Sequence, residues 1–416
     1  MGNKIILSVF ACLLFTDSIQ AQFSQFDSAY TAAYSENYDY FNPEFEKPNS
    51  SNYFDSKYIT LSYEKHDTNG NNSNIVFRKV LFNSLEDEVM ITNDNFRNTE
   101  PAAGHSIILW QSDKNGNNDI YYSTYNGAGW ADASPLQITT EDETEPDVAE
   151  YNVSGFPPAY LITYKAGNEI HFKVLHENIV IFDTVLTSVI SEACSLPKIK
   201  MYNSRILIGY LKNVNSINKF VLIKAEINSS YAINWTSSEE ISNLNTVEDF
   251  RFCNAGAKKI IMIYDYDTLG SYKNIGIYED ETDTKLILNN EPGTNISGKA
   301  SVFLQSIPFY SPLSVFCWLK RSNDSSMIVA TSNLIFNPVR KIFYAGDSSQ
   351  NTRLDLSSYF YNQPQNAFRY RLIWEQKINN RSALRMSQCD HGSAGIQTTS
   401  TLVPREFHLE QNYPNP

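Results

Sequence analysis

Four side chains that carry oxygen atoms alternate along one short segment of the chain. Asp113, Asn115, Asn117 and Asp119 occupy every second position, and a glycine lies among them. Oxygen ligands with this spacing can converge on a hard cation such as Ca²⁺. Asn, Asp and Gly are also the residues that tight hairpin turns use, and this glycine is not where an EF-hand loop requires it. The segment is therefore a candidate calcium site or a plain hairpin turn, and no other cofactor is expected.

Other groups that could do chemistry are scattered along the chain. Cys389, Asp390 and His391 adjoin, but neighbouring residues of an extended chain point to opposite faces and do not form a nucleophile and base pair. Acidic residues crowd segment 141–147, yet a carboxylate pair for glycoside hydrolysis is defined in space and not by sequence. Neither a Gly-rich phosphate loop nor a GxSxG nucleophile elbow occurs. We therefore name no catalytic residue.

The composition is that of a globular, strand-rich protein with an acidic surface. Hydrophobic residues make up 42% of the 416 residues, and 26 Tyr and 24 Phe contribute to an aromatic content of 13%. Aromatic side chains suit a pleated, half-buried surface better than a helix. The formal net charge of −13 should repel nucleic acids and anionic membrane surfaces, so neither is expected as a partner.

The first 21 residues have the features of an export signal. Lys4 supplies the positive charge, Ile5 to Phe15 an apolar run, and Ala21 a small residue at the expected cleavage site before Gln22. The apolar run is too short to span a bilayer, and no later segment is long enough. The mature chain is expected outside the cell without a transmembrane segment. Its four cysteines show no zinc-type spacing, and their disulfide pairing stays open: Cys194, Cys253, Cys317 and Cys389.

A short apolar strand that ends in an aromatic residue recurs seven times along the chain. The aromatic residues are Tyr63, Trp110, Tyr164, Tyr210, Tyr264, Trp318 and Trp374, at intervals of 47, 54, 46, 54, 54 and 56 residues. A polar turn and a second strand follow each of them, as in a hairpin. These second strands are expected at Asn74 to Lys79, Asp119 to Thr124, Glu169 to Val174, Lys219 to Lys224, Asn274 to Tyr278, Ser326 to Ala330 and Ser382 to Met386.

Each repeat predicts a four-stranded antiparallel unit that cannot bury both of its faces alone. We therefore predict an all-β, seven-bladed β-propeller in which the aromatic residues pack between blades; six or eight blades are the alternatives. The first innermost strand is expected near Ser50 to Phe54, and Pro101 and Pro146 are expected in connections that lead into innermost strands. The last blade needs an outer strand, which either Phe23 to Tyr40 or Ala394 to Leu402 could supply.

Two segments resemble known families. Segment Trp110 to Ser123 has a Ser-Asp pair, a Gly turn and an Asp-Ile-Tyr strand, and it resembles the WD-like repeat of TolB-like propellers. The other six repeats keep only the hydrophobic pattern. This resemblance implies a propeller fold and says little about function.

The C-terminal segment resembles the start of the sorting domain that type IX secretion systems of Bacteroidetes and their relatives recognise. The matching residues are Phe407, Leu409, Gln411, Asn412, Tyr413, Pro414, Asn415 and Pro416. In that family a small β-sandwich follows the motif and is removed during export. The resemblance implies that the type IX secretion machinery is a partner, that the sequence is a fragment of a longer product, and that this product is released or attached to the cell surface.

These observations lead to one expectation about function and one alternative. Propellers commonly bind ligands through loops at one mouth of the ring, so a non-enzymatic module that recognises a glycan or an extracellular protein is expected. The alternative is a secreted polysaccharide hydrolase with a carboxylate pair at the propeller axis. The expected segments are a signal peptide (1–21), an N-terminal segment (22–48), the propeller (49–392), a linker (393–406) and the sorting motif (407–416).

Overall fold

The structure is a computed structural model, and it describes the chain in many short stretches. The described residues are 29–47, 58–68, 70–81, 84–152, 156–187, 192–202, 204–241, 247–255, 259–268, 272–279, 284–287, 294–302, 314–322, 325–334, 337–339, 351–361 and 367–392. The expected signal peptide, linker and sorting motif lie outside these residues. Within them, no helix has the length and hydropathy needed to traverse a bilayer.

The described residues form seven antiparallel sheets of four strands each. Three sheets come from the first part of the chain, and each follows chain order. Their strands are β2 (Tyr38–Phe45), β3 (Tyr58–Asp67), β4 (Ser73–Leu81) and β5 (Val89–Met90); β6 (Asn98–Ala103), β7 (Ile107–Ser112), β8 (Asp119–Thr124) and β9 (Ser134–Pro135); and β10 (Glu143–Tyr151), β11 (Ala159–Ala166), β12 (Glu169–His176) and β13 (Ile179–Val185).

Three further sheets repeat this order, and the last combines both ends of the described chain. The strands of the three are β14 (Cys194–Tyr202), β15 (Arg205–Val214), β16 (Ile217–Ile227) and β17 (Ile233–Glu240); β18 (Val247–Ala255), β19 (Lys259–Thr268), β20 (Tyr272–Glu279) and β21 (Thr284–Ile287); and β22 (Thr294–Val302), β23 (Ser314–Ser322), β24 (Ser325–Leu334) and β25 (Asn337–Val339). The last sheet has the order β1-β28-β27-β26, with β1 (Tyr30–Ala33), β26 (Asn351–Tyr361), β27 (Ala367–Ile378) and β28 (Arg381–Gly392).

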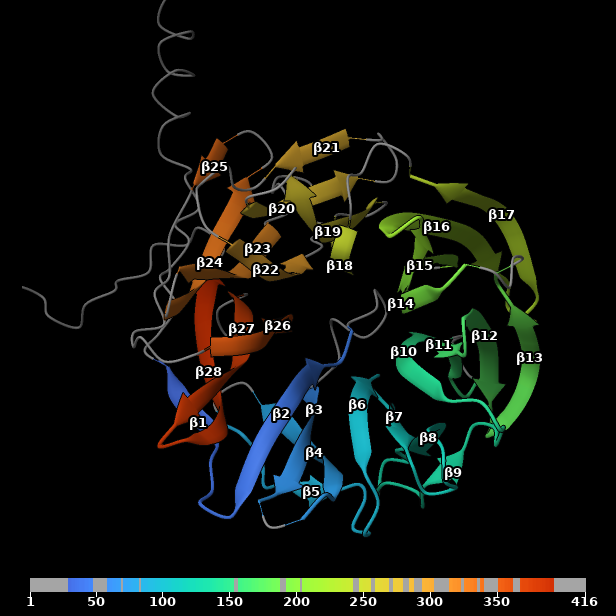
Figure 1. Ribbon diagram of the computed structural model, residues 1–416, viewed down its shortest axis with the longest axis horizontal. Helices are drawn as coiled ribbons and strands as arrows, with labels where there is room; N and C mark the ends of the chain where they lie inside the picture. Colours follow the sequence, from blue (N-terminus) through green and yellow to red (C-terminus); the bar gives the residue numbers. More distant parts are fainter. Residues whose placement is uncertain are drawn as a thin grey trace, which may run out of the picture.

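The sheets lie side by side around a common centre, which is the arrangement of a β-propeller (Figure 1). Their innermost strands contact one another in sequence: β6 contacts β10, β10 contacts β14, β14 contacts β18 and β18 contacts β22. β22 contacts β26, while β2 contacts β26, β28 and β6. The predicted all-β class with four-stranded antiparallel sheets is therefore confirmed.

The fourth strand of the last sheet comes from the N-terminal part of the described chain. β1 pairs antiparallel with β28, so that Tyr30 lies opposite Met386 and Ala33 opposite Leu384. The N-terminal segment was one of the two sources that the sequence left open for this strand. The pairing with β1 covers this edge of β28. An unpaired strand edge can recruit another chain, so the pairing protects the sheet from such association.

The core consists of apolar side chains packed between neighbouring sheets. One buried cluster joins Phe172 of β12 to Ile199, Ile208 and Ile223 of the next sheet. Five of the repeated aromatic residues belong to such buried clusters. The repeated aromatic residues with described side chains are all buried, as the packing prediction required: Tyr63, Trp110, Tyr164, Tyr210, Trp318 and Trp374.

The hairpin strands agree with the sequence prediction, but the first innermost strand does not. All seven second strands of the predicted hairpins occur, as β4, β8, β12, β16, β20, β24 and β28. The segment expected to form the first innermost strand, 50–54, lies outside the described residues, and β2 at Tyr38–Phe45 pairs with β3 instead. Residues 46–57 separate β2 from β3, so the first innermost strand comes earlier in the chain than predicted.

The strands that carry the repeated aromatics also continue past them. β3 ends at Asp67 and β15 at Val214, several residues beyond Tyr63 and Tyr210. The residues after each aromatic are mostly polar. Their backbone groups still form hydrogen bonds with the next strand, because this pairing does not depend on the polarity of the side chains. Hydropathy alone therefore placed the strand ends too early.

Candidate functional site

Each innermost strand contains a β-bulge, and in five of the seven strands the bulge lies opposite the repeated aromatic residue of the next strand. The register shifts lie between Phe41 and Glu44, Thr99 and Ala102, Thr144 and Asp147, Ser195 and Lys198, Val247 and Asp249, Ile296 and Lys299, and Thr352 and Leu354. Bulges re-aim side chains and are common next to functional sites. Because five of the bulges recur at one level of the sheets, the side chains that they redirect lie around the common centre.

Non-glycine residues at five of these bulges have a positive φ angle. They are Asn42 at 50°, Glu100 at 51°, Glu145 at 57°, Leu196 at 51° and Arg353 at 36°. Residues other than glycine seldom adopt this left-handed region, and such conformations concentrate at ligand-binding and active sites. The five residues therefore mark this end of the innermost strands as the candidate site.

Proline follows four of the five bulge residues, as Pro43, Pro101, Pro146 and Pro197. Pro101 and Pro146 lie inside β6 and β10, so the expectation that they occupy connections between units is wrong. Proline has no N–H to donate to a ladder, and a bulge is a place within a sheet where that loss is tolerated. The repeated X-Pro pair is thus a signal for the bulge itself.

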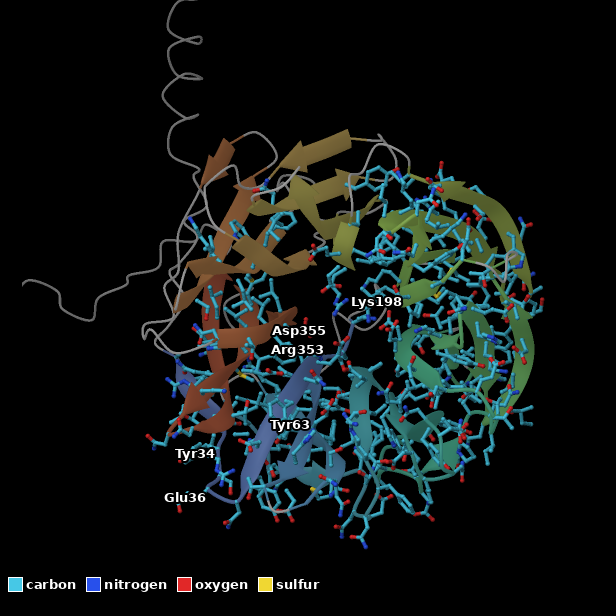
Figure 2. All side chains as sticks on the ribbon, viewed as in Figure 1. Tyr34, Glu36, Tyr63, Lys198, Arg353 and Asp355 are labelled. Carbon is cyan, nitrogen blue, oxygen red and sulfur yellow. The ribbon has the colours of Figure 1, made fainter. Side chains whose placement is uncertain are left out.

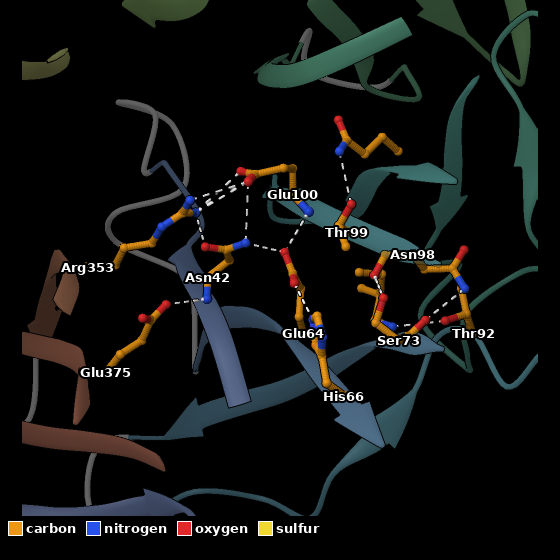
Figure 3. Close-up of polar contacts among 12 residues, drawn as sticks. Asn42, Glu64, His66, Ser73, Thr92, Asn98, Thr99, Glu100, Arg353 and Glu375 are labelled. Atoms are coloured by element: carbon orange, nitrogen blue, oxygen red, sulfur yellow. Dashed lines mark hydrogen bonds and ion pairs between the residues drawn. The ribbon is translucent and has the colours of Figure 1, made fainter. Parts of the chain in front are cut away.

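Side chains of the preceding sheet, two of them buried, hold three of the bulges in place. Glu375 Oε1 accepts a hydrogen bond from the backbone N–H of Asn42 at 2.7 Å, and Glu64 Oε1 accepts one from Glu100 at 2.7 Å (Figure 3). Gln111 Oε1 accepts from Glu145 N at 3.4 Å. Each acceptor directly follows a repeated aromatic residue in the sequence. The aromatic packs the sheets together, and the next residue positions the neighbouring bulge.

Two aspartates add a second tie between innermost strands. Asp147 Oδ2 accepts a hydrogen bond from Ile199 N at 2.7 Å, and Asp355 Oδ2 accepts one from Phe45 N at 2.6 Å. Both aspartates are buried. Asp147 Oδ1 also accepts from the ammonium group of Lys47, which comes from the end of β2. Charge-assisted bonds of this kind are strong and fix the relative height of the strands.

Residues at or beside six of the bulges line a cavity of about 510 Å³, which we call the axial pocket. Figure 2 labels Lys198 and Arg353 on different sides of the common centre of the sheets. The charged residues that line the axial pocket are Glu44, Glu100, Glu145, Lys198, Asp249, Arg251 and Arg353. Among the described lining residues, none is aromatic.

Charged side chains that line the axial pocket are held by nearby partners. Arg353 Nη1 lies 3.4 Å from Glu100 Oε1 and also donates to the side-chain oxygen of Asn42 (Figure 3). Arg251 Nη1 lies 2.9 Å from Asp249 Oδ1. Glu145 Oε2 accepts from the backbone N–H of Leu196 at 2.5 Å. The lining therefore presents both signs of charge in fixed positions.

Burial and charges from several sheets shift the pKa values of the cations near the axis. Burial and the nearby Arg251 guanidinium hold the pKa of Lys198 below its ordinary value. Burial acts in the same direction on the pKa of Arg251, but Asp249, Glu44, Asp355 and Glu100 outweigh it and raise that pKa. Burial lowers the pKa of Lys47 well below its ordinary value. A charged ligand group that enters the axial pocket would meet this combined field in a partly desolvated space.

The candidate calcium segment forms the turn between β7 and β8. Asp113 Oδ1 accepts from Arg97 N at 2.8 Å, while Asp119 accepts from Thr139 N at 3.2 Å and from Asn115 Nδ2 at 2.8 Å. Asn117 Nδ2 donates to Glu141 O at 2.8 Å. The structure thus gives the four side chains local hydrogen-bond partners, and the calcium site stays a prediction. Within the described ranges, no group of three or more His, Cys, Asp or Glu residues is placed to hold a metal ion.

Comparison with known proteins identifies no family. No protein-family model matches the chain, and no curated protein matches it either. Among solved structures, the β-propeller domain of the Trilobed protease from Pyrococcus furiosus is 9% identical, with a TM-score of 0.42 over 82% of this chain and 94% of that one. A subtype N11 neuraminidase-like protein of A/flat-faced bat/Peru/033/2010 (H18N11) is 10% identical, with a TM-score of 0.42 over 90% and 96%.

An acylaminoacyl peptidase, solved in complex with Z-Gly-Gly-Phe-chloromethyl ketone, is 8% identical. Its TM-score is 0.47, over 86% of this chain and 52% of that one. The chain therefore spans about half the length of that enzyme.

Sequence reasoning missed the residues of the axial pocket. No sequence motif marks the bulge residues Asn42, Glu100, Glu145 and Leu196. The lining cations Lys198 and Arg353 share no motif either. The usable signal was the repeated X-Pro pair, which recurs one strand ahead of each of the first four aromatic residues. Its meaning depends on the bulge, which hydropathy patterns do not reveal.

Proposed function

We propose that the seven sheets are the blades of one closed propeller ring. The support is the series of contacts between innermost strands, which returns from β26 to β2, and the pairing of β1 with β28. In such a ring the bulges lie around one axis, and the axial pocket opens at one mouth.

The propeller acts as a non-enzymatic binding module that recognises a charged segment of an extracellular protein at the axial pocket. The observation that carries this proposal is the ring of bulges, which presents Glu100, Glu145, Lys198, Arg251 and Arg353 in fixed positions. Fixed charges of both signs favour a partner of complementary charge and exclude others. The same geometry favours binding over hydrolysis, because Glu100, Glu145 and Asp249 are each engaged by a cation or a backbone N–H.

The module works outside the cell, at the surface or in the medium, after export through the type IX secretion system. The support is the N-terminal signal and the C-terminal motif Phe407 to Pro416. Protein recovered from the medium or the cell surface of a native producer should begin at Gln22, as read by N-terminal sequencing. An N-terminus at Met1 in that material would contradict the export proposal.

The binding proposal is tested with a synthetic peptide of alternating Glu and Lys and an uncharged Gly-Ser peptide of the same length. Calorimetry and thermal unfolding of the chain from Gln22 should show binding of the charged peptide, and added NaCl should weaken that binding. The variant with both Glu100→Gln and Arg353→Gln should lose it. Lys377→Gln, which removes a charge from an exposed position on β27, should not.

Three outcomes would contradict the proposal. They are no binding of the charged peptide, equal binding of the Gly-Ser peptide, and unchanged binding by the double variant. Incubation of a polysaccharide mixture with the protein tests the hydrolase alternative. Shortened products in that mixture, lost when a carboxylate of the axial pocket is replaced, would establish hydrolysis instead.

A further inference from the structure

A second recess lies at the outer rim of the molecule, far along the sheets from the axial pocket. It has a volume of about 380 Å³ and lies between the outer strands β13 and β17 of neighbouring sheets (Figure 1). We call it the rim groove. Its lining residues are Thr184, Val185, Leu186, Ile223, Trp235, Thr236, Ser237 and Ser238. Small-molecule sites have volumes of roughly 300–1,000 Å³, so the rim groove is at the lower end of that range.

Trp235 is the largest side chain in the rim groove, and it is both exposed and firmly held. Its side chain is 39% exposed. Its indole ring packs edge-on against Phe172 at 5.5 Å and an interplanar angle of 79°, and it lies 6.5 Å from Phe182. Phe172 is fully buried and contacts Phe182 at 5.9 Å. Two aromatic rings of the neighbouring sheet therefore hold the exposed indole.

The rest of the lining is uncharged and consists of four hydroxyl side chains and three aliphatic ones, Val185, Leu186 and Ile223. The hydroxyl side chains are Thr236, Ser237 and Ser238, which follow Trp235 on β17, and Thr184 on β13. The Thr236 hydroxyl donates to Lys224 O at 2.9 Å, and the Thr184 hydroxyl to Val185 O at 3.5 Å. An uncharged groove is notable on a chain whose formal net charge is −13. It contrasts with the axial pocket, where charged residues dominate the lining.

A pyranose ring matches this combination of groups. It has an apolar C–H face that can stack on an indole, and a rim of hydroxyl groups that exchange hydrogen bonds with Ser and Thr. A charged peptide or an acidic sugar would leave its charge without a partner in this lining. We propose that the rim groove binds a neutral oligosaccharide, with Trp235 as the stacking platform. This site is separate from the axial pocket and does not depend on the function proposed for it.

The test titrates the chain from Gln22 with four neutral hexasaccharides built from glucose or mannose, by calorimetry and by tryptophan fluorescence. At least one hexasaccharide should bind and change the fluorescence. Trp235→Ala should lower the affinity by roughly tenfold or more, and Trp235→Phe should keep part of it. Ser237→Ala should weaken binding without a change in thermal stability, because Ser237 is exposed.

Trp130→Phe is the matched control, since Trp130 lies near β9, away from the rim groove, and packs against Phe77 and Tyr125. It should bind as the native chain does. The axial double variant Glu100→Gln with Arg353→Gln should also bind sugar normally, which separates failure at one site from failure at the other.

The proposal would be overturned if none of the four hexasaccharides bound, or if Trp235→Ala bound them unchanged. Self-association of the chain that Trp235→Ala abolishes, with no sugar binding, would instead identify the groove as an interface between copies.

Discussion

Gly209 of β15 lies against aromatic side chains of β16 and of the neighbouring strand β18. A Cβ atom at this position would meet ring atoms of Phe250 at 2.7 Å, Phe220 at 2.8 Å and Phe252 at 2.9 Å. Phe220 and Phe250 are themselves packed edge-to-face at 4.7 Å. The residue directly before Tyr210 is therefore glycine because three aromatic rings occupy the space of a side chain.

We expect Gly209→Ala to lower the free energy of unfolding by about 1–3 kcal/mol, because the added methyl group overpacks a filled core. Urea unfolding followed by tryptophan fluorescence measures this change. Gly129→Ala is the control, since nothing lies within 4 Å of a Cβ there, and its effect should stay within about 0.5 kcal/mol. Equal stabilities of the two variants would show that the three rings can move aside.

His105 forms a pair with a buried carboxylate. Its Nδ1 lies 3.0 Å from Glu46 Oε2, which also accepts from Thr60 N at 3.0 Å. Burial lowers the pKa of His105, but the hydrogen bond and charge of Glu46, with the charge of Glu150, raise it to about 9. The imidazole is therefore charged in the folded protein at neutral pH, unlike an ordinary histidine.

This pair should make stability depend on pH in the alkaline range. A histidine whose pKa is higher in the folded than in the unfolded state stabilises fully below its unfolded pKa of about 6.5. That contribution is lost as the pH rises through about 9. We expect the unfolding free energy to fall between these values, and His105→Gln to remove this part of the decline. An NMR titration of His105 with a midpoint near 6.5 would contradict the expectation.

At the scale of elements, a Ser–Asn pair joins neighbouring sheets. Ser73 at the start of β4 donates to Asn98 O at 2.7 Å, and Asn98 Nδ2 donates to Ser73 O at 3.1 Å. Asn98 Oδ1 also accepts from the indole N–H of Trp110 at 3.1 Å. Ser326 and Asn351 repeat the reciprocal bonds between β24 and β26. The pair ties the third strand of one sheet to the innermost strand of the next.

Asn98→Ala should lower the unfolding free energy by about 1–3 kcal/mol, since it leaves the buried Trp110 N–H and Ser73 carbonyl without this partner. Chemical denaturation measures the loss. Asn213→Ala provides the comparison, because Asn213 also bonds a neighbouring side chain, Asn218 at 2.8 Å, but does so in solvent. Asn213→Ala should lower the unfolding free energy by less than Asn98→Ala does. Equal losses in the two variants would show that burial does not strengthen the Ser–Asn pair.

At the scale of the whole molecule, β1 carries the N-terminal part of the chain to the last sheet. Ala32 and Ala33 join a buried cluster with Ile373, Leu384 and Met386. Arg78 of the neighbouring sheet donates to Ala32 O at 2.5 Å. The strand thus contacts its own sheet and the next one.

A chain that begins at Asn37 should be much less stable than one that begins at Gln22. It lacks β1, exposes the edge of β28 and uncovers part of this cluster, which favours aggregation. Thermal unfolding and size-exclusion chromatography compare the two chains. Equal midpoints and equal elution would show that β1 does not help to hold the ring together.

The repeat pattern predicted the fold well and the candidate site poorly. Tyr63, Trp110 and their counterparts repeat because each sheet needs a large buried side chain at the same level, and such demands are visible as a period in the sequence. Glu100 and Arg353 contact each other near the axis although 253 positions separate them, and no local sequence pattern predicts that contact. The position of β2 was missed because the length of the connection to β3 is not encoded in hydropathy.

The sequence by itself determined the strand-rich class, the seven hairpins and the buried aromatic residues, because these follow from short-range alternation of apolar and polar side chains. Only the tertiary structure decided which segment completes the last sheet, that the prolines mark bulges, and that the bulge residues enclose a charged pocket. It also placed Trp235 beside Phe172 of another sheet. These features depend on strands distant in sequence lying side by side, and packing in three dimensions alone brings them together.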